Sequence, residues 1–469
     1  MLWRMSKYVT EPPPERGVFA NRTLNLRAVQ AIGYDMDYTL IHYRVEEWER
    51  AAFEHARAVL ARRGWPVEPL EFDPEQFTIG LVFDLELGNL LKASRFGYVS
   101  RSRHGNSMLP FEQQRRLYQD TVVELSEPRF EFMNTLFELS RASLWTQLVE
   151  IHDREPLDGV SSYADLYRIV DDALDESHNA GALKADIVAD PARFVDLDPD
   201  IVQTLTDQRA AGKQLLLITN SDWAYAQRMM HHCIDPFCTD GDTWRDLFDV
   251  VIVSAAKPSF FQYNNPIYRV IDEAQSLLHT HTGPLETGHV YFGGNARLVE
   301  QSLARVDVHP LYVGDHLFGD VHVAKELLRW RTALIVRELE DEIVDSVGFT
   351  DQQAALEQLM AEKVDVDRQQ ARLRMVGRSA ATDLATATAT AAELDRRIAP
   401  LAKAASDLGN PTWGPLMRAG NDKSLFARQV ERYADVYTSR VSNLRHETPY
   451  AYLRAARGSL PHDGAGHSH

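Results

Sequence analysis

The sequence predicts an α/β fold built on a doubly wound parallel sheet. Short apolar runs recur along the chain and end in polar or glycine-bearing turns, which is typical of parallel strands that are buried on both faces. Between two of these runs, residues 222–232 place Trp223, Ala226 and Met230 on one face of a helix. Strands that alternate with helices in this way indicate a doubly wound sheet.

Each expected strand leads into a polar segment. The apolar runs are residues 31–34, 214–218, 250–253 and 311–313, and a fifth strand is expected at 332–336. In sheets of this class, ligands bind at the carboxyl ends of the strands. The candidate site is therefore made of the segments that follow the first four runs, which are Asp35-Met36-Asp37, Thr219-Asn220-Ser221, Lys257-Pro258 and Gly314-Asp315.

The spacing of the runs predicts the domain organisation. Residues 1–40 form an N-terminal lead-in and the first strand, and residues 208–346 supply the rest of the core. The stretch between them is too long for one crossover, and its apolar spacing favours helices, so we expect a mostly helical cap over 41–207. The pattern beyond residue 346 predicts a helical extension over 347–460, which includes an Ala-Thr tract at 380–392. Residues 461–469 are expected to be disordered.

The composition is that of a soluble protein with several domains. The 469 residues are 44% hydrophobic and 25% charged, and they include Cys233 and Cys238 only, which favours a reducing compartment. The formal net charge of −18 argues against non-specific binding to nucleic acid or to an anionic membrane. Residues 1–17 lack the apolar stretch of a secretory signal, and the apolar runs are too short to span a bilayer. We therefore expect a cytoplasmic location.

The carboxylates that follow the strands predict a magnesium site. Asp35 and Asp37 are two residues apart, so both side chains point to the same side of an extended chain. Asp315 and Asp320 follow the fourth run. Carboxylates that converge repel one another unless a cation joins them, and oxygen ligands without His or Cys favour Mg²⁺.

The remaining groups at these strand ends are suited to phosphoryl transfer. The second run is followed by two hydroxyls and an amide, from Thr219, Ser221 and Asn220, and the third by the ammonium group of Lys257. Charge on a moving phosphoryl group must be neutralised, and carboxylates, Mg²⁺, a lysine and a hydroxyl together can do this. Each motif alone is common on surfaces, but all of them in this order are not.

These motifs resemble those of the haloacid-dehalogenase-like phosphohydrolases. The first and fourth motifs are more specific, and they resemble the cytosolic purine 5′-nucleotidases, which act on IMP and GMP. The resemblance extends over most of the chain. The segments that carry it are Asp35-Met36-Asp37-Tyr38-Thr39-Leu40, Thr219-Asn220-Ser221, Lys257-Pro258, Gly314-Asp315-His316-Leu317-Phe318-Gly319-Asp320, Asn134-Thr135-Leu136-Phe137, Asp175-Glu176-Ser177-His178 and Ser424-Leu425-Phe426-Ala427.

The resemblance implies a role for each catalytic residue. Asp35 would be the nucleophile that forms an aspartyl-phosphate, and Asp37 would protonate the leaving oxygen and later deprotonate water. Thr219 and Lys257 would hold the phosphoryl oxygens, with the substrate-binding residues Asn220 and Ser221 beside them. Mg²⁺ would be bound by Asp35, by the backbone carbonyl of Asp37 and by Asp315. Asp320 would orient this shell.

The resemblance also implies a nucleoside pocket in the cap. Phe137 would stack on the base, and Asp175, His178 and Lys184 would line the pocket. Two alternatives stay open, because Phe137 also fits a hydrophobic core and His178 also fits a helix end. The chain departs from the family pattern here, with Asp171 where the family carries an arginine and Asn179 where it carries an aromatic residue.

The resulting expectation is a Mg²⁺-dependent phosphoric monoester hydrolase. Its substrates would be nucleoside 5′-monophosphates such as IMP and GMP, and its aspartyl-phosphate could also be passed to a nucleoside. The alternatives are a phosphatase for another metabolite and a catalytically silent protein that binds nucleotides as a regulator. The apolar side chains within residues 413–460 have near-helical spacing, which fits either packing on the chain's own core or an interface with another copy. The resemblance favours a homo-oligomer, either a dimer or a tetramer.

Overall fold

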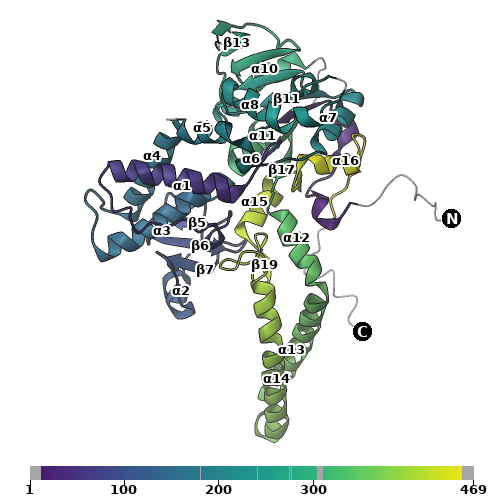
Figure 1. Cartoon of the computed structure of the whole chain (residues 1–469). Helices are drawn as coiled ribbons and strands as arrows, with labels where there is room; N and C mark the ends of the chain where they lie inside the picture. The colour runs from purple at the N-terminus through teal and green to yellow at the C-terminus, as the bar shows by residue number, and fades with distance from the viewer. Residues whose placement is uncertain are drawn as a thin grey trace, which may run out of the picture.

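A ten-stranded sheet forms the centre of the molecule (Figure 1). This computed structural model describes residues 12–179, 181–239, 241–273, 275, 277–303 and 310–456, so the expected tail at 461–469 lies outside the described residues. The strands from β20 to β15 are parallel, whereas β1 and the hairpin β13–β14 run antiparallel at the two edges. In spatial order the strands are β1 (Val18–Ala20), β20 (Val436–Thr438), β17 (Arg331–Ile335), β16 (Leu311–Gly314), β3 (Ala31–Tyr34), β11 (Gln214–Ile218), β12 (Val250–Val253), β15 (His289–Gly293), β13 (Ile267–Asp272) and β14 (Leu277–Thr280).

Helices cover both faces of this sheet, which confirms the predicted doubly wound α/β fold. Alternate residues of β11 enter two different hydrophobic clusters: Leu215 and Leu217 pack on one face, and Leu216 and Ile218 pack on the other. This explains why the strands are continuous apolar runs in the sequence. The first face is covered by α7 (Ile201–Ala210) and α8 (Trp223–Cys233), and the second by α9 (Ser259–Gln262), α10 (Ala296–Ser302) and α11 (Val323–Leu328).

The cap is inserted directly after β3. The chain leaves the core through β4 (His42–Tyr43) and returns through β10 (Val195–Asp196), which pairs antiparallel with β4. Helix α7 follows β10 and lies with the core, so the return point precedes the expected boundary at residue 207. The helices of the cap are α1 (Val45–Arg62), α2 (Phe111–Tyr118), α3 (Leu139–Arg154), α4 (Tyr163–Asn179), α5 (Ala182–Ala189) and α6 (Pro191–Phe194).

The cap also contains a five-stranded antiparallel sheet, which the sequence did not predict. Strand β6 carries Lys92 and strand β7 carries Arg101, and both side chains donate to backbone carbonyls of residues 406–415. Charged residues that are satisfied in this way break the apolar alternation by which a strand is recognised. The strands, in spatial order, are β8 (Ser107–Met108), β7 (Val99–His104), β6 (Asn89–Ala93), β5 (Val82–Asp84) and β9 (Phe130–Phe132).

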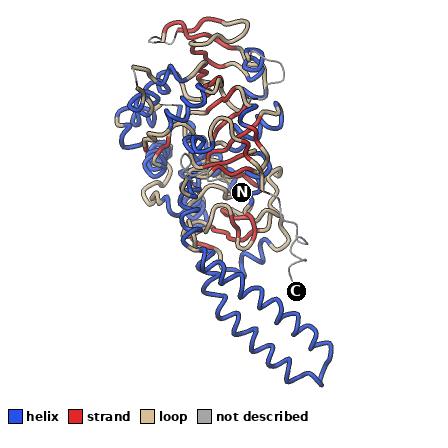
Figure 2. Tube along the Cα trace, turned by 90° about the vertical axis from the view of Figure 1, so that its right-hand side faces the viewer, coloured by secondary structure: helices blue, strands red, loops and turns tan. Residues whose placement is uncertain are grey.

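The segment after residue 346 divides into two parts. Helix α12 (Leu339–Gly348) leads into a long antiparallel hairpin of α13 (Thr350–Val376) and α14 (Ala381–Ser406), which projects from the body (Figure 2). The Ala-Thr tract lies in α14, where Ala387 and Ala391 are buried.

The second part, after the hairpin, returns to the core instead of extending the helices. Helix α15 (Leu425–Tyr433) packs on the body, β20 joins the central sheet between β17 and β1, and α16 (Leu444–Glu447) follows. Most of the large apolar side chains of this part are therefore buried, although Tyr450 and Tyr452 are exposed. This agrees with the expected alternative of packing on the chain's own core, and the buried residues include Leu416, Phe426, Val430, Tyr433 and Val436.

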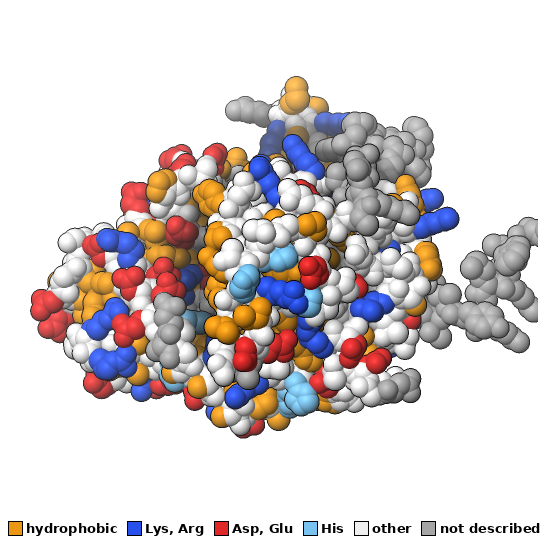
Figure 3. All heavy atoms as spheres, turned by 90° about the horizontal axis from the view of Figure 1, so that it is seen from above, with side chains coloured by type: hydrophobic (Ala, Val, Ile, Leu, Met, Phe, Trp, Pro, Cys, Tyr) orange, Lys and Arg blue, Asp and Glu red, His pale blue; other side chains and the backbone are white. Residues whose placement is uncertain are grey.

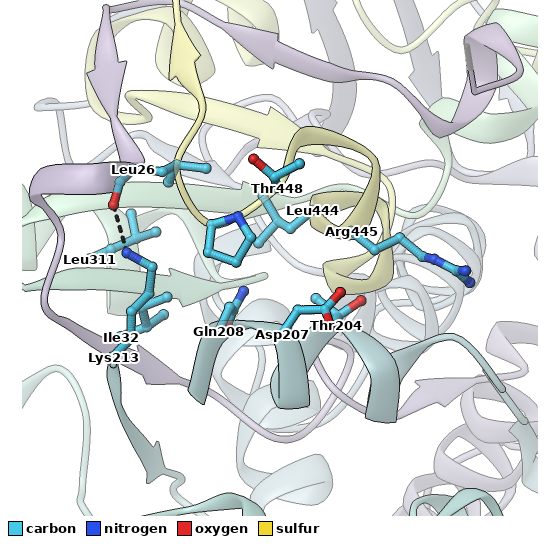
Figure 4. Close-up of a pocket in the computed structure, with 11 residues that line it drawn as sticks. Leu26, Ile32, Thr204, Asp207, Gln208, Lys213, Leu311, Leu444, Arg445 and Thr448 are labelled. Carbon is cyan, nitrogen blue, oxygen red and sulfur yellow. Dashed lines mark hydrogen bonds between the residues drawn. The ribbon is translucent and has the colours of Figure 1, made fainter. Parts of the chain in front are cut away.

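The amino ends of the central strands are closed by a buried lysine. Lys213 Nζ donates to the carbonyls of Leu26 and Val29, at 2.6 Å each, and the first bond is drawn in Figure 4. Burial lowers the pKa of Lys213 to about 8. The small pocket beside it, with a volume of about 10 Å³, has room for about one water molecule. Lys213 therefore anchors the N-terminal segment to the opposite end of the strands from Asp35.

The face of the molecule seen from above carries charges of both signs (Figure 3). On the described part of the face seen from above, acidic and basic side chains are interspersed rather than gathered into one basic patch (Figure 3). Within the described ranges, none of the helices combines the length and the apolar character that a membrane crossing requires.

Candidate active site

The sheet brings the predicted motifs together at the carboxyl ends of its central strands. Tyr34, the last residue of β3, lies opposite Leu217 of β11 on one side and Val313 of β16 on the other. The next residue, Asp35, is therefore flanked by the loops that follow β11 and β16. The loop after β12 contributes Lys257. Doubly wound sheets bind their ligands at such a position, where the order of the strands reverses.

Lys257 lies between two carboxylates at the centre of this site. Its Nζ atom is 2.6 Å from Asp35 Oδ2 and 2.9 Å from Asp320 Oδ1, and it donates to Tyr312 Oη at 3.0 Å. Burial alone would lower the pKa of Lys257, but Asp320 and Asp35 raise it well above its usual value. Burial raises the pKa of Asp35 to about 6, against the lowering effect of Lys257. Lys257 is therefore held as a cation between the two carboxylates, and its charge favours the ionised form of Asp35.

Three carboxylates of this cluster have the arrangement of a metal site. Asp35, Asp315 and Asp320 each offer an oxygen, and these oxygens lie within 4.8 Å of one another. Burial, together with the charges of Asp35 and Asp320, raises the pKa of Asp315 well above its usual value. A cation would relieve this crowding, and an oxygen-only donor set fits a hard divalent ion such as Mg²⁺. The residues present therefore fit the expected metal.

Asp37 lies outside this carboxylate cluster. Its Oδ1 accepts a hydrogen bond from Tyr43 Oη at 2.6 Å, and its Oδ2 accepts one from Ser221 Oγ at 2.8 Å. Burial raises the pKa of Asp37, and the Tyr43 hydrogen bond opposes this change. Burial also raises the pKa of Tyr43 well above its usual value, so its phenol remains a donor. The two aspartates of the first motif therefore have different surroundings, one ionic and one formed by hydroxyl groups.

The second motif supports the site mainly through hydrogen bonds. Thr219 is fully buried, and its Oγ1 accepts from the backbone N–H of Ser221 at 3.0 Å. The Asn220 side chain bonds both backbone groups of Lys257: its Oδ1 accepts from the N–H, and its Nδ2 donates to the carbonyl at 3.1 Å. Asn220 therefore holds the loop that carries the lysine.

The backbone of these loops is strained or crowded. Tyr38, Ser254 and Ala256, which flank Asp37 and Lys257, are three of the five non-glycine residues with positive φ in the described ranges. Strained residues of this kind concentrate at functional sites. Gly314 is required for a different reason, because a Cβ atom there would lie 2.4 Å from Asp320 Oδ2.

The cap brings Phe137 close to the first motif. This half-buried residue lies in the short turn before α3, and its ring meets Tyr38 edge-on at 4.7 Å and Trp48 at 5.2 Å. The same turn begins at Thr135, whose hydroxyl lies 3.4 Å from Asp315 Oδ2. Phe137 is only partly buried and its ring packs against Tyr38 and Trp48, so the geometry agrees with both expected roles.

The other residues expected in the nucleoside pocket make fewer contacts with the catalytic loops. His178 is on α4, where its Nδ1 lies 3.3 Å from the carbonyl of Leu174 and burial lowers its pKa. Asp175 is exposed on the same helix. Lys184 of α5 reaches the core, with its Nζ 3.3 Å from Asp222 Oδ2. Asp222 lies at the start of α8, directly after the second motif. Among the described residues, Lys184 is therefore paired with this part of the core, whereas His178 and Asp175 make no hydrogen bond or ion pair with it.

Several residues at the site were not predicted. Tyr43 bonds both Asp37 and Tyr225, and Tyr312 bonds Lys257. Arg141 of α3 pairs with both Glu138 and Asp171, so an arginine does reach Asp171, but from another helix. The only sequence signal for Arg141 is its position four residues after Phe137. The three tyrosines lie within six residues of the motifs, but nothing in the pattern marks them as part of the site.

A comparison with protein families identifies the chain. A model described as the 5′ nucleotidase family matches residues 18–465. The chain belongs to the 5′ nucleotidase family. This membership confirms the family that the sequence motifs indicated, the haloacid-dehalogenase-like 5′-nucleotidases. The chain is therefore a phosphoric monoester hydrolase, of a family that generally uses a divalent metal.

Two similar members of the 5′ nucleotidase family come from mammals. The chain is 30% identical to 5′-nucleotidase domain-containing protein 2 of Homo sapiens, over 91% of this chain and 81% of that protein. It is 29% identical to the protein of the same name from Rattus norvegicus, over 95% of this chain and 80% of that one. Among solved structures, an archaeal β-phosphoglucomutase from Pyrococcus sp. strain ST 04 aligns with a TM-score of 0.31 and 9% identity, over 66% of this chain and 86% of that one.

Proposed function

We propose that the chain hydrolyses nucleoside 5′-monophosphates, with IMP and GMP as substrates, through an aspartyl-phosphate on Asp35. The observation that carries this proposal is the difference between Asp35 and Asp37. Asp35 is paired with Lys257 at 2.6 Å, and this cation stabilises the charged carboxylate that a nucleophile must be. Burial raises the pKa of both aspartates, so the difference lies in their partners: Asp37 is held by two hydroxyls, which can stay bonded to it as it gives and takes a proton.

The proposed reaction has two displacements. A carboxylate oxygen of Asp35 attacks phosphorus, the bond from phosphorus to O5′ breaks, and a proton moves from Asp37 to O5′. Water then attacks the aspartyl-phosphate, Asp37 takes the proton, and phosphate leaves. Thr219 and Lys257 hold the phosphoryl oxygens through both steps, and Lys257 remains charged throughout.

Mg²⁺ is the proposed metal. Asp35, Asp315 and the backbone carbonyl of Asp37 would hold it, and Asp320 would orient this group, since it already bonds Lys257. When bound, Mg²⁺ would supply positive charge to the phosphoryl oxygens. We expect EDTA to abolish phosphate release and Mg²⁺ to restore it, with Ca²⁺ a poor substitute because it prefers more ligands and longer bonds. Full turnover in EDTA would contradict the proposal.

The substrate is best tested by phosphate release from a panel of phosphomonoesters. The panel should contain IMP, GMP, AMP, CMP and UMP with a sugar phosphate and 4-nitrophenyl phosphate. We expect kcat/KM to be higher for the nucleotides than for the sugar phosphate. We also expect that inosine, when it is added, accepts phosphate from a donor nucleotide. A preference for the sugar phosphate would favour the alternative of a phosphatase for another metabolite. No turnover of any ester with Mg²⁺ present would favour a nucleotide-binding regulator.

We also propose that the chain assembles as a homo-oligomer, either a dimer or a tetramer. The edge hairpin β13–β14 supports this proposal, because it exposes Ile271, Leu277 and Leu278. An edge strand with exposed apolar side chains tends to pair with another chain. A second copy of this chain would cover the edge.

A further inference from the structure

The carboxylate of Asp37 is fixed at both oxygens. Tyr43 Oη donates to Oδ1 at 2.6 Å, and Ser221 Oγ donates to Oδ2 at 2.8 Å. Tyr225 Oη lies 2.9 Å from Tyr43 Oη. A phenol has a single proton, and Tyr43 uses it for Asp37, so the hydrogen bond between the two tyrosines must be donated by Tyr225. The result is a directed chain from Tyr225 to Tyr43 to Asp37.

This chain of hydroxyls joins the core to the cap. Tyr43 lies on β4, the strand by which the chain leaves the core, and it pairs with Val195 on the returning strand β10. Its ring also packs on Trp48 of α1, with the ring centres 4.4 Å apart. Tyr225 is on α8 of the core, and the ammonium group of Lys184 from cap helix α5 lies 4.9 Å from its ring. The position of Tyr43 therefore depends on the cap and on its linker.

The two oxygens of Asp37 are not equivalent in this arrangement. The partner of Oδ1 is the hydroxyl of Tyr43, a buried residue whose ring packs against Tyr38 and Trp48. The partner of Oδ2 is a serine hydroxyl, which can turn and either donate or accept. Oδ2 is therefore the oxygen that can carry a proton without loss of its hydrogen bond.

We propose that Tyr43, ordered by Tyr225, is a positioning residue that fixes Oδ1 of Asp37 and leaves Oδ2 to exchange the proton with the ester oxygen and with water. This inference rests on the proposed function. In the first step, the proton on Oδ2 passes to O5′ as the bond from phosphorus to O5′ breaks and Asp35 becomes bonded to phosphorus. In the second step, water bonds to phosphorus, the bond to Asp35 breaks, and the proton of the water returns to Oδ2. Through Tyr43, the cap linker sets the geometry of both transfers.

The test compares esters that differ in how much they need a proton. In Tyr43→Phe, the ring remains and the hydroxyl is removed. We measure release of the leaving group in a single turnover, which reports the first step only, with 4-nitrophenyl phosphate, phenyl phosphate and IMP. The nitrophenolate leaves without a proton, so its rate should fall less than about threefold, whereas the other two rates should fall about tenfold or more. Equal losses for all three esters, or no loss for any, would overturn the proposal.

A matched control removes a similar hydroxyl elsewhere. Tyr118 Oη donates to Asp84 Oδ2 at 2.9 Å in the cap, where both side chains are buried. In Tyr118→Phe, the rates for the three esters should keep the ratio of the wild type, even if a thermal melt shows lower stability. If the loss in Tyr118→Phe also grows with the need for a proton, the effect at Tyr43 is not specific and the proposal fails.

A second variant tests the proposal even if Tyr43→Phe does not fold. Tyr225→Phe removes the donor to Tyr43 without touching Asp37, and its losses should be smaller than those of Tyr43→Phe but follow the same order of esters. A uniform loss would contradict the ordering role of Tyr225. If the wild type cleaves both aryl esters but not IMP, the proposed substrate is wrong. The comparison of the two aryl esters then still decides the role of Tyr43.

Discussion

At the scale of single residues, the chemistry depends on the contrast between Asp35 and Asp37. Two aspartates that are two residues apart would ordinarily have similar proton affinities. Here Lys257 pairs with Asp35, and Tyr43 and Ser221 bond Asp37. A charged nucleophile and a proton carrier can therefore coexist on one short loop.

The first prediction concerns Asp35. In Asp35→Asn the size is kept and the nucleophilic charge is lost, so turnover should fall by several orders of magnitude. Phosphate release measures the loss, and a thermal melt checks that the protein is still folded. Residual activity within about tenfold of the wild type would exclude the covalent mechanism, since tenfold is only about 1.4 kcal/mol of barrier.

The second prediction concerns Glu49, a buried carboxyl group of α1 whose Oε2 accepts from the backbone N–H of Ser140 at 2.7 Å. Burial raises the pKa of Glu49 to about 7, although the hydrogen bonds from Ser140 lower it. The folded protein therefore holds a proton that the unfolded chain releases at lower pH. The contribution to the free energy of unfolding is complete below the unfolded pKa of about 4.3 and is lost as the pH rises toward 7.

Glu49→Gln should remove this dependence, because glutamine can still accept from Ser140 but has no proton to lose. We expect the wild type to lose stability relative to Glu49→Gln between about pH 5 and pH 8. Chemical denaturation at several pH values measures the difference. A constant difference between the two proteins over this range would show that Glu49 is ionised throughout.

At the scale of elements, the cap positions a ring beside the catalytic loop. The turn before α3 carries Phe137, and the first turn of α3 is held by Glu49. The residues proposed for catalysis contact phosphate, metal and the ester oxygen, so selection of the base must come from another element. The cap contacts the first motif, because Trp48 and Phe137 both pack against Tyr38.

The third prediction tests Phe137 in this role. If Phe137 stacks on the base, Phe137→Ala should lose about 1–3 kcal/mol in nucleotide binding. The loss should be seen in kcat/KM for IMP and be absent for 4-nitrophenyl phosphate, which carries no base. Equal losses for both substrates, together with a lower melting temperature, would make Phe137 a packing residue.

The burial of the strands explains which of them could be predicted from the sequence. The central strands were predictable because both of their faces are buried, which makes them continuous apolar runs. The sheet of the cap was not, because Lys92 and Arg101 interrupt its strands and are satisfied by carbonyls more than 300 residues away in the chain. The catalytic residues lie in short linear motifs, whereas Tyr43, Tyr225 and Arg141 reach the site only through the packing of separate elements.

At the scale of the whole molecule, the fourth prediction concerns assembly. The subunit mass is 53.2 kDa, and we expect light scattering at micromolar concentration to report a multiple of it. Leu277→Lys on the exposed edge strand β14 should lower that mass while the melting temperature is kept, because the side chain is half exposed in the single chain. A particle of 53 kDa for the wild type would contradict the proposed homo-oligomer.

The fifth prediction concerns the long hairpin, which has a hydrophobic cluster of its own. Leu356, Leu359, Leu394 and Ile398 pack with each other, apart from the clusters of the body. At the base of the hairpin, the backbone N–H of Gly409 bonds Asp345 Oδ2 at 3.1 Å, so the two ends of the hairpin are already held together. The distal half can therefore be removed without opening the core. The residues proposed for catalysis and for the base pocket all lie in the body or in the cap.

A variant that replaces residues 367–391 with a short glycine-rich turn should therefore keep the catalytic activity of each subunit. It retains the cluster at the base and the ion pair between Lys363 and Asp395, which are 2.7 Å apart. We expect kcat/KM for IMP to be unchanged, and the body to unfold at the same denaturant concentration, because stability is lost mainly where packed surface is lost. A matching loss of activity and of particle mass would instead show that the hairpin acts through assembly. A loss of activity at constant mass would show that the hairpin contributes directly to the site.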